Sequence, residues 1–164
     1  MDSNMSSSTE FVAWPKIGRL NREILITEKI DGTNAAVHVG PDGQLIACQS
    51  RTRLITPEDD NYGFAKWAYA NQDLFSQLGP GVHHGEWAGQ GIQKRYKGPK
   101  QFWLFNARRW SSLDGLGVVP VLYNDMYEPG IIEDTLATLK VHGSVAYPGA
   151  EPEGIIVYWP SSNQ

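Results

Sequence analysis

Short strand-like segments separated by tight turns constrain the fold of this chain more than any other feature. Runs rich in β-branched and aliphatic residues occupy positions 23–29, 33–39 and 44–51, with only a few residues between them. Pro41-Asp42-Gly43 is a strong turn sequence between the second run and the third. Connections this short join antiparallel neighbours, because parallel strands need a crossover of a dozen or more residues. These segments therefore predict an antiparallel meander.

The remaining sequence adds two helices and further strands. Residues 60–78 place large apolar side chains at helical spacing, with Asp60 or Asn61 available as the N-cap. The other predicted elements are strands at 82–87, 101–107, 118–123 and 153–159 and a short helix at 131–140. Few helices and mostly antiparallel strands indicate the α+β fold class. We expect residues 1–10 to be a flexible tail and residues 11–164 to form one domain.

Composition limits the functions open to the chain. Its 164 residues carry a formal net charge of -4, so a nucleic-acid contact would need a local basic patch. Cys48 is the single cysteine, which excludes an intramolecular disulfide and fits a reducing compartment. The sequence has no long apolar run and no basic segment followed by an apolar one, so we expect neither a membrane span nor a secretory signal. We expect a monomer in the cytoplasm, or in the host cytoplasm if the source is a virus.

The segment Glu28-Lys29-Ile30-Asp31-Gly32-Thr33-Asn34 is the first candidate for chemistry. A lysine amine attacks only when neutral, so a nucleophilic lysine needs a site that removes its proton. The Asp31-Gly32 bend would project Lys29 from a strand end into a cleft beside a carboxylate. The alternative is a surface lysine beside an ordinary Asp-Gly turn, and this segment alone would favour that alternative.

Four more segments favour the functional interpretation, because they follow the lysine segment in one particular order. They are Ser50-Arg51-Thr52, His84 to Gly89, Phe102 to Asn106 and Pro152 to Val157. Together the five segments resemble the covalent nucleotidyltransferase superfamily of ligases and capping enzymes, above all the ATP-dependent RNA ligase 2 family. The stretch GEWAGQGIQK, residues 85–94, is an unusually specific match. The resemblance covers residues 23–159.

This resemblance implies a fold and a catalytic set. The fold would be an ATP-grasp-like nucleotidyltransferase domain, in which antiparallel sheets and a few covering helices flank a nucleotide cleft. Lys29 would take AMP from ATP as a phosphoramidate, and Glu153 would act near Lys29 and a divalent metal, Mg²⁺ or Mn²⁺. Asp31 and Asn34 would order the lysine, the metal-bound waters and the acceptor phosphate.

The resemblance also implies a set of residues that bind ATP. Glu28 would help to present the adenine-binding backbone, Arg51 would lie near the ribose and phosphates, and Glu86 would hold the ribose hydroxyls. Phe105 would stack on adenine, with Trp103 as the other aromatic side chain in reach of that role. Considered singly, these residues have ordinary structural interpretations: exposed strand carboxylates, a solvated arginine and a core phenylalanine.

Basic residues gather in two neighbouring segments of the sequence. Six of the 14 lysines and arginines fall there: Lys94, Arg95, Lys97, Lys100, Arg108 and Arg109. The alternatives are a solvated charged loop and a contact with the phosphate backbone of a nucleic acid. We predict that Lys94, Arg95 and Lys97 contact RNA.

The sequence also departs from the family. The family continues past the segment Glu153 to Val157 with a strand that carries two lysines, whereas this chain has no lysine after Lys140. We therefore expect a domain truncated at its C-terminus. The predicted activity is ATP-dependent joining of RNA ends, a 5′-phosphate and a 3′-hydroxyl, through lysyl-AMP. The alternatives are a catalytically defective nucleotide- or RNA-binding homologue, a DNA ligase and a GTP-using capping enzyme.

Overall fold

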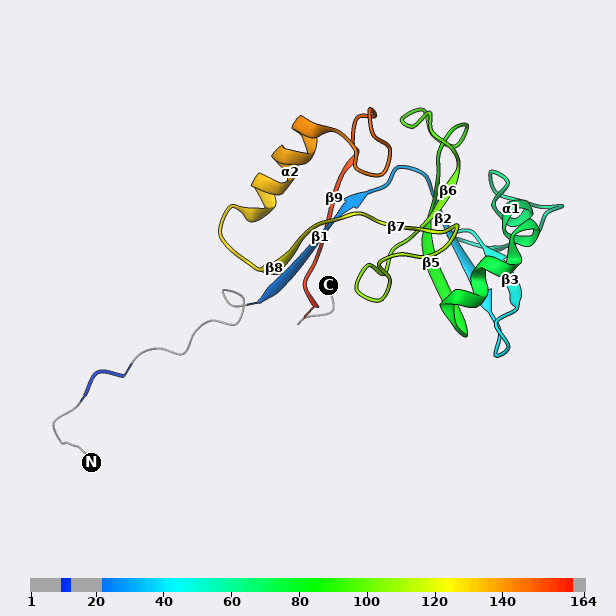
Figure 1. Cartoon of the computed structure of the whole chain (residues 1–164), viewed down its shortest axis with the longest axis horizontal. Coiled ribbons are helices and arrows are strands. Elements are labelled where there is room, and N and C mark those ends of the chain that lie inside the picture. Colours follow the sequence, from blue (N-terminus) through cyan, green and yellow to red (C-terminus); the bar gives the residue numbers. More distant parts are fainter. Residues whose placement is uncertain (1–9, 13–21, 161–164) are drawn as a thin grey trace.

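The computed structural model of the chain describes residues 10–12 and 22–160, which form two β-sheets with helices around them (Figure 1). The predicted tail, apart from Glu10, lies outside the described residues. One sheet has three antiparallel strands in the order β8 (Val121–Met126), β1 (Glu23–Lys29) and β9 (Gly154–Tyr158). The other has six, in the order β4 (Leu54–Ile55), β3 (Leu45–Gln49), β2 (Thr33–Val39), β5 (Gly81–Ala88), β6 (Gln101–Leu104) and β7 (Gly117–Val118).

The α+β class is confirmed, and among the strands of residues 22–160 only β6 and β7 pair in parallel. The helices are α1 (Phe64–Ala70), the 3₁₀ helix η2 (Gln72–Leu78) and α2 (Ile131–His142). In Figure 1, α1 lies beside the six-stranded sheet and α2 beside the three-stranded sheet, at opposite ends of the molecule. No helix in the described part of the chain is long and apolar enough to cross a membrane.

The predicted meander is wrong in its first pair of strands. β2 and β3 do pair, but β1 pairs with β8 and β9, and so it belongs to the other sheet. The reason lies in the connection between β1 and β2. A Cβ on Gly32 would stand 2.2 Å from the carbonyl oxygen of Trp87, and Ile30 is buried between the sheets. The chain therefore crosses from one sheet to the other directly after Lys29.

Three other elements differ from their predicted bounds by more than two residues at an end or by a division into two. The helix predicted at 60–78 divides into α1 and η2, and Asp60 accepts hydrogen bonds from the backbone N–H groups of Ala65 and Lys66. The strand predicted at 101–107 ends at Leu104. The strand predicted at 118–123 divides into β7 and β8, in different sheets. Pro120 lies between them, and its carbonyl oxygen accepts the backbone N–H of Glu28 at 3.0 Å.

The core has two parts. The larger part lies between the six-stranded sheet and the helices α1 and η2, where the rings of Phe64 and Phe102 lie 5.0 Å apart and those of Trp67 and Trp87 4.9 Å apart. The smaller part, which we call the bridging cluster, consists of Ile30, Ala88, Tyr96, Val119 and Tyr147. It contains residues from the connections of both sheets, and it therefore joins the two sheets.

Cys48 provides a test of the larger core. Its side chain is completely buried, and burial raises the pKa of the thiol from 9.0 to about 12. Because only the thiolate is alkylated, we expect iodoacetamide at pH 8 to modify the folded protein on the order of 1,000-fold more slowly than the denatured protein. Mass spectrometry with and without denaturant measures both rates. Equal rates would contradict the packing of β3 against α1.

Candidate nucleotide-binding and catalytic site

A cleft of about 710 Å³ opens between the two sheets. Its size is within the range of roughly 300 to 1,000 Å³ that is usual for small-molecule sites. All eight residues that the sequence predicts for catalysis and nucleotide binding line it: Glu28, Lys29, Asp31, Asn34, Arg51, Glu86, Phe105 and Glu153. They come from β1, β2 and β5, from the bend between β1 and β2, and from the loops that follow β3 and β6 or precede β9. The fold thus brings together residues separated by more than a hundred positions.

Lys29 and Glu153 lie side by side at one edge of the three-stranded sheet. Lys29 is the last residue of β1 and is paired with Gly154, the first residue of β9, so the sheet register places Glu153 next to the lysine. Lys29 Nζ lies 3.3 Å from Glu153 Oε2, and the side chains are 53% and 24% exposed. Glu153 Oε2 is a buried atom, and apart from this ion pair it accepts no hydrogen bond from the described residues. The lysine is therefore accessible from the cleft, and one carboxylate oxygen retains acceptor capacity.

Glu86 organises the opposite wall of the cleft. It faces Asn34 in the pairing of β5 with β2, and its two carboxylate oxygens accept hydrogen bonds from Gly32 N–H at 3.0 Å and Asn34 Nδ2 at 2.9 Å. Arg51 Nε donates to Asn34 Oδ1 at 2.7 Å and extends the network to the loop after β3. Burial raises the pKa of Glu86, while the hydrogen bonds from Gly32 and Asn34 lower it in part. This network fixes the bend that follows Lys29.

Asp31 and Arg95 pair with each other. Arg95 Nε donates to Asp31 Oδ2 at 3.0 Å, and Arg95 Nη1 lies 3.4 Å from the carbonyl oxygens of Glu151 and Pro152. The sequence predicted that Asp31 would order Lys29 and metal-bound waters, and that Arg95 would contact RNA. In the structure both side chains connect the lysine bend to the segment that leads into Glu153, and Asp31 also lines the cleft.

The carboxylate of Glu28 is occupied by hydrogen bonds from the protein itself. Its side chain is 1% exposed and accepts hydrogen bonds from Ser144 Oγ at 2.6 Å, Val145 N–H at 2.8 Å and Ala146 N–H at 3.0 Å. All three donors belong to the loop between α2 and β9. The geometry therefore does not support a direct contact between this carboxylate and the nucleotide. Glu28 contributes to the cleft through its position in β1.

The end of β6 places an aromatic ring and a further cation in the cleft. Phe105 follows the last residue of the strand and is 45% exposed, in contrast to the buried Leu104. Trp103, the alternative stacking residue, lines a different cavity. Arg108 also lines the cleft, with its guanidinium 5.9 Å from the Tyr158 ring. The sequence identified Arg108 only as part of a basic patch, because nothing local shows that this turn faces the cleft.

Lys94 and Lys97 do not line this cleft. Both are exposed residues of the loop between β5 and β6, and they line other cavities on its surface. Their predicted contact with RNA would therefore lie outside this cleft.

The donor set fits a divalent cation that is bound partly by its substrate. No group of three or more His, Cys, Asp or Glu side chains among the described residues is arranged to hold a metal ion alone. Mg²⁺ commonly uses one or two carboxylates, with phosphates and waters as the remaining ligands. Glu153 Oε2, a buried oxygen without a hydrogen-bond partner in the described chain, is suited to that role.

A lysine at a strand end, a buried carboxylate network and an aromatic ring thus surround one cleft between the two sheets. The sequence matches the RNA ligase family over residues 22–164, and the chain belongs to that family. A comparison with curated proteins gave no match.

Solved structures of an RNA ligase from Naegleria gruberi share the fold. A mutant with ATP and manganese is 18% identical, with a TM-score of 0.58, and the alignment covers 85% of this chain and 47% of that chain. A mutant with AMP and manganese is 17% identical, with a TM-score of 0.59, and the alignment covers 86% of this chain and 47% of that chain. The same ligase with pyrophosphate is 18% identical, with a TM-score of 0.58, and the alignment covers 89% of this chain and 49% of that chain. The chain thus spans about half the length of these structures.

Proposed function

We propose that this chain carries the adenylation chemistry of an ATP-dependent RNA ligase. In this reaction Lys29 takes AMP from ATP, the AMP passes to an RNA 5′-phosphate, and a 3′-hydroxyl then displaces it to form the phosphodiester. The observation that carries the proposal is the position of Lys29, exposed in the cleft and 3.3 Å from Glu153 Oε2. RNA as the substrate is supported by membership of the RNA ligase family.

The cleft offers a distinct contact for each part of ATP. The exposed ring of Phe105 provides a face for adenine. Each oxygen of Glu86 accepts one hydrogen bond and has a further lone pair for a ribose hydroxyl. Arg51 and Arg108 both line the cleft and supply positive charge for phosphates. Glu28 acts through the backbone of β1, for the reason given above.

The first step forms a P–N bond and breaks a P–O bond. Neutral Lys29 Nζ attacks the α-phosphorus. The bond between the α-phosphorus and the bridging oxygen breaks, and pyrophosphate leaves with that oxygen and the electron pair of the bond. The lysine must lose a proton first, and Glu153 is the carboxylate beside Nζ that can accept it. Mg²⁺ or Mn²⁺ held by Glu153 and the phosphates would supply neutralisation of the developing charge. The manganese in the similar ligase structures is consistent with such a requirement.

Covalent labelling tests the proposal. The purified chain is incubated with Mg²⁺ and ATP labelled at the α-phosphate, and then denatured and separated by electrophoresis. A label that survives denaturation is expected with ATP and not with GTP, and transfer to nicked RNA rather than nicked DNA would identify the substrate. Labelling from GTP would favour a capping enzyme, and sealing of DNA would favour a DNA ligase. Binding of ATP by the folded chain without a label would overturn the proposal.

Glu86 gives the labelling a characteristic pH dependence. Because burial raises its pKa, Glu86 gains a proton at a higher pH than an ordinary glutamate as the solution is acidified. The protonated carboxyl loses acceptor capacity for Gly32 and Asn34, so the labelling rate should fall as pH drops through this raised pKa. Glu86→Gln should be slower by about tenfold at neutral pH. Its pH profile should lack this acid limb, and an unchanged limb would assign the titration to another group.

A further inference from the structure

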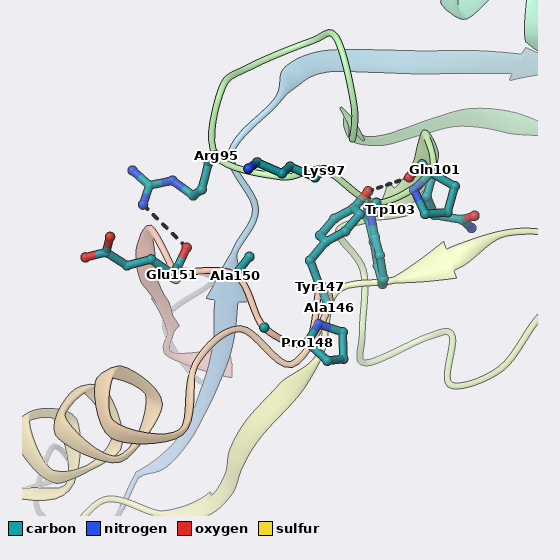
Figure 2. A pocket seen from close by; sticks show the side chains of 12 residues that line it. Arg95, Lys97, Gln101, Trp103, Ala146, Tyr147, Pro148, Ala150 and Glu151 are labelled. Atoms are coloured by element: carbon teal, nitrogen blue, oxygen red, sulfur yellow. Dashed lines mark hydrogen bonds between the residues drawn. The ribbon is translucent and has the colours of Figure 1, made fainter.

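A second cavity, of about 680 Å³, lies between the loop that joins β5 to β6 and the loop that joins α2 to β9 (Figure 2). It shares no lining residue with the nucleotide cleft. Its walls are the loop between β5 and β6, the start of β6 and the loop between α2 and β9. Tyr96 and Tyr147 of the bridging cluster, stacked with ring centroids 4.2 Å apart, contribute to the wall that supports it.

The cavity contains a fixed aromatic surface. Trp103 lines it, and the indole Nε1–H donates to the Tyr147 hydroxyl at 3.1 Å, which donates in turn to the carbonyl oxygen of Pro99 at 3.2 Å. These bonds hold the indole in one orientation. Figure 2 shows Trp103 and Tyr147 next to each other, with Arg95 and Lys97 on one side and Gln101 on the other. An oriented ring of this kind stacks on any nucleobase, because every base has a π-face.

The loop between β5 and β6 carries positive charge beside this aromatic surface. Lys97 lines the cavity, as does the exposed Glu151, while Lys94 and Lys100 belong to the same loop without lining the cavity. All three lysines are exposed, and none forms an ion pair within the described ranges 10–12 and 22–160. The chain as a whole is acidic, with a formal net charge of -4, so this concentration of cations is local. A polyanion with flat bases is the ligand that complements both features.

Arg95 connects this cavity to the catalytic cleft. It lines the cavity while its Nε donates to Asp31, two residues from Lys29, and its Nη1 lies 3.4 Å from the carbonyl oxygens of Glu151 and Pro152. A strand seated beside Lys97 would therefore continue toward the bend that carries the nucleophile.

We infer that this cavity binds the RNA strand, with one base stacked on Trp103 and an adjacent phosphate at Lys97, away from the reacting end. The inference rests on the proposed function, because it assigns a site to the substrate of that reaction. It also gives the predicted contact of Lys97 with RNA a specific position. Lys94 and Lys100 then add charge along the path of the strand.

Binding of blocked RNA tests this site without any reaction. The probe is a fluorescein-labelled single-stranded RNA of about 12 nucleotides with a 5′-hydroxyl and a 3′-phosphate, measured by anisotropy over a range of salt concentrations. Lys97→Ala and Trp103→Leu should each weaken binding about tenfold. Lys97→Ala should also reduce the slope of log affinity against log salt by about 0.7, the value for one phosphate contact on a single strand. Lys66→Ala, an exposed lysine on α1, is the matched control and should leave both unchanged.

The outcomes separate this inference from the proposed function. Thermal unfolding shows whether each variant is folded. If Trp103→Leu does not fold, the RNA affinity of Lys97→Ala alone tests the inference. Unchanged affinity in Lys97→Ala, or an equal loss in Lys66→Ala, would overturn the assignment of the cavity to RNA. ATP labelling of the unmodified chain is measured separately. If ATP labels the unmodified chain but Lys97→Ala binds RNA with unchanged affinity, only this inference is overturned. If ATP does not label the unmodified chain but Lys97→Ala binds RNA more weakly, only the proposed adenylation chemistry is overturned.

Discussion

Lys29→Ala should abolish covalent labelling by ATP, with a loss on the order of 10⁴-fold or more. The described residues that line the cleft include one lysine, Lys29. No second lysine in the lining can therefore take its place as the nucleophile. Lys29→Arg should be equally inactive, although it can keep the ion pair with Glu153. A guanidinium does not lose its proton at any working pH, so it cannot present a lone pair to phosphorus. The two variants together separate the need for a nucleophile from the need for a positive charge.

The measurement is the same electrophoretic assay, with ATP binding followed in parallel by calorimetry. Lys29 is 53% exposed, so its removal should change the unfolding temperature little, and any loss of label is then chemical rather than structural. Lys66→Ala serves again as the control and should retain the label. A labelled Lys29→Ala protein would show that another residue is the nucleophile. A labelled Lys29→Arg protein would contradict the role of the neutral amine.

The sequence predicts the composition of the site better than the contacts within it. Strand periodicity identified β1, β2 and β9, and the family resemblance of the five segments identified eight residues that line the cleft. Periodicity says that a segment is a strand, but it does not say which strand will be its partner. The assignment of β1 to a separate sheet depends on Gly32 against Trp87 and on the buried Ile30, which are long-range contacts.

The same limit applies to the basic residues. A cluster of cations in a sequence does not show which members the fold uses internally. Arg109 donates to the carbonyl oxygen of Leu78 at 3.0 Å and lies 4.4 Å from the Trp110 ring, so it supports the packing beside η2. Arg95 is engaged by Asp31. Arg108 and Lys97 are both exposed and each lines a cavity, Arg108 the nucleotide cleft and Lys97 the second cavity, so these two residues of the group are placed to bind a ligand.

Glu28→Ala should destabilise the protein more than any other substitution in the lysine segment. The buried carboxylate accepts three hydrogen bonds, of 2.6, 2.8 and 3.0 Å, from the loop that follows α2. Removing it leaves the Ser144 hydroxyl and two backbone N–H groups without their acceptor, at a cost of about 3 to 5 kcal/mol. In a chain of this size we expect the unfolding temperature to fall by roughly 10 °C. Calorimetric unfolding measures the change directly.

Two further variants make this prediction specific. Glu23→Ala removes an exposed glutamate from the start of the same strand and should change stability by no more than about 0.5 kcal/mol. Glu28→Gln keeps the shape and one acceptor oxygen, so its cost should fall between those of the two alanine variants. If Glu28 instead contacted ATP through its carboxylate, Glu28→Ala would weaken ATP binding with little loss of stability. That result would contradict its position against Ser144. The expected order follows because Glu28 holds the loop before Glu153 to the strand that carries Lys29, and thereby keeps the two reacting side chains in register.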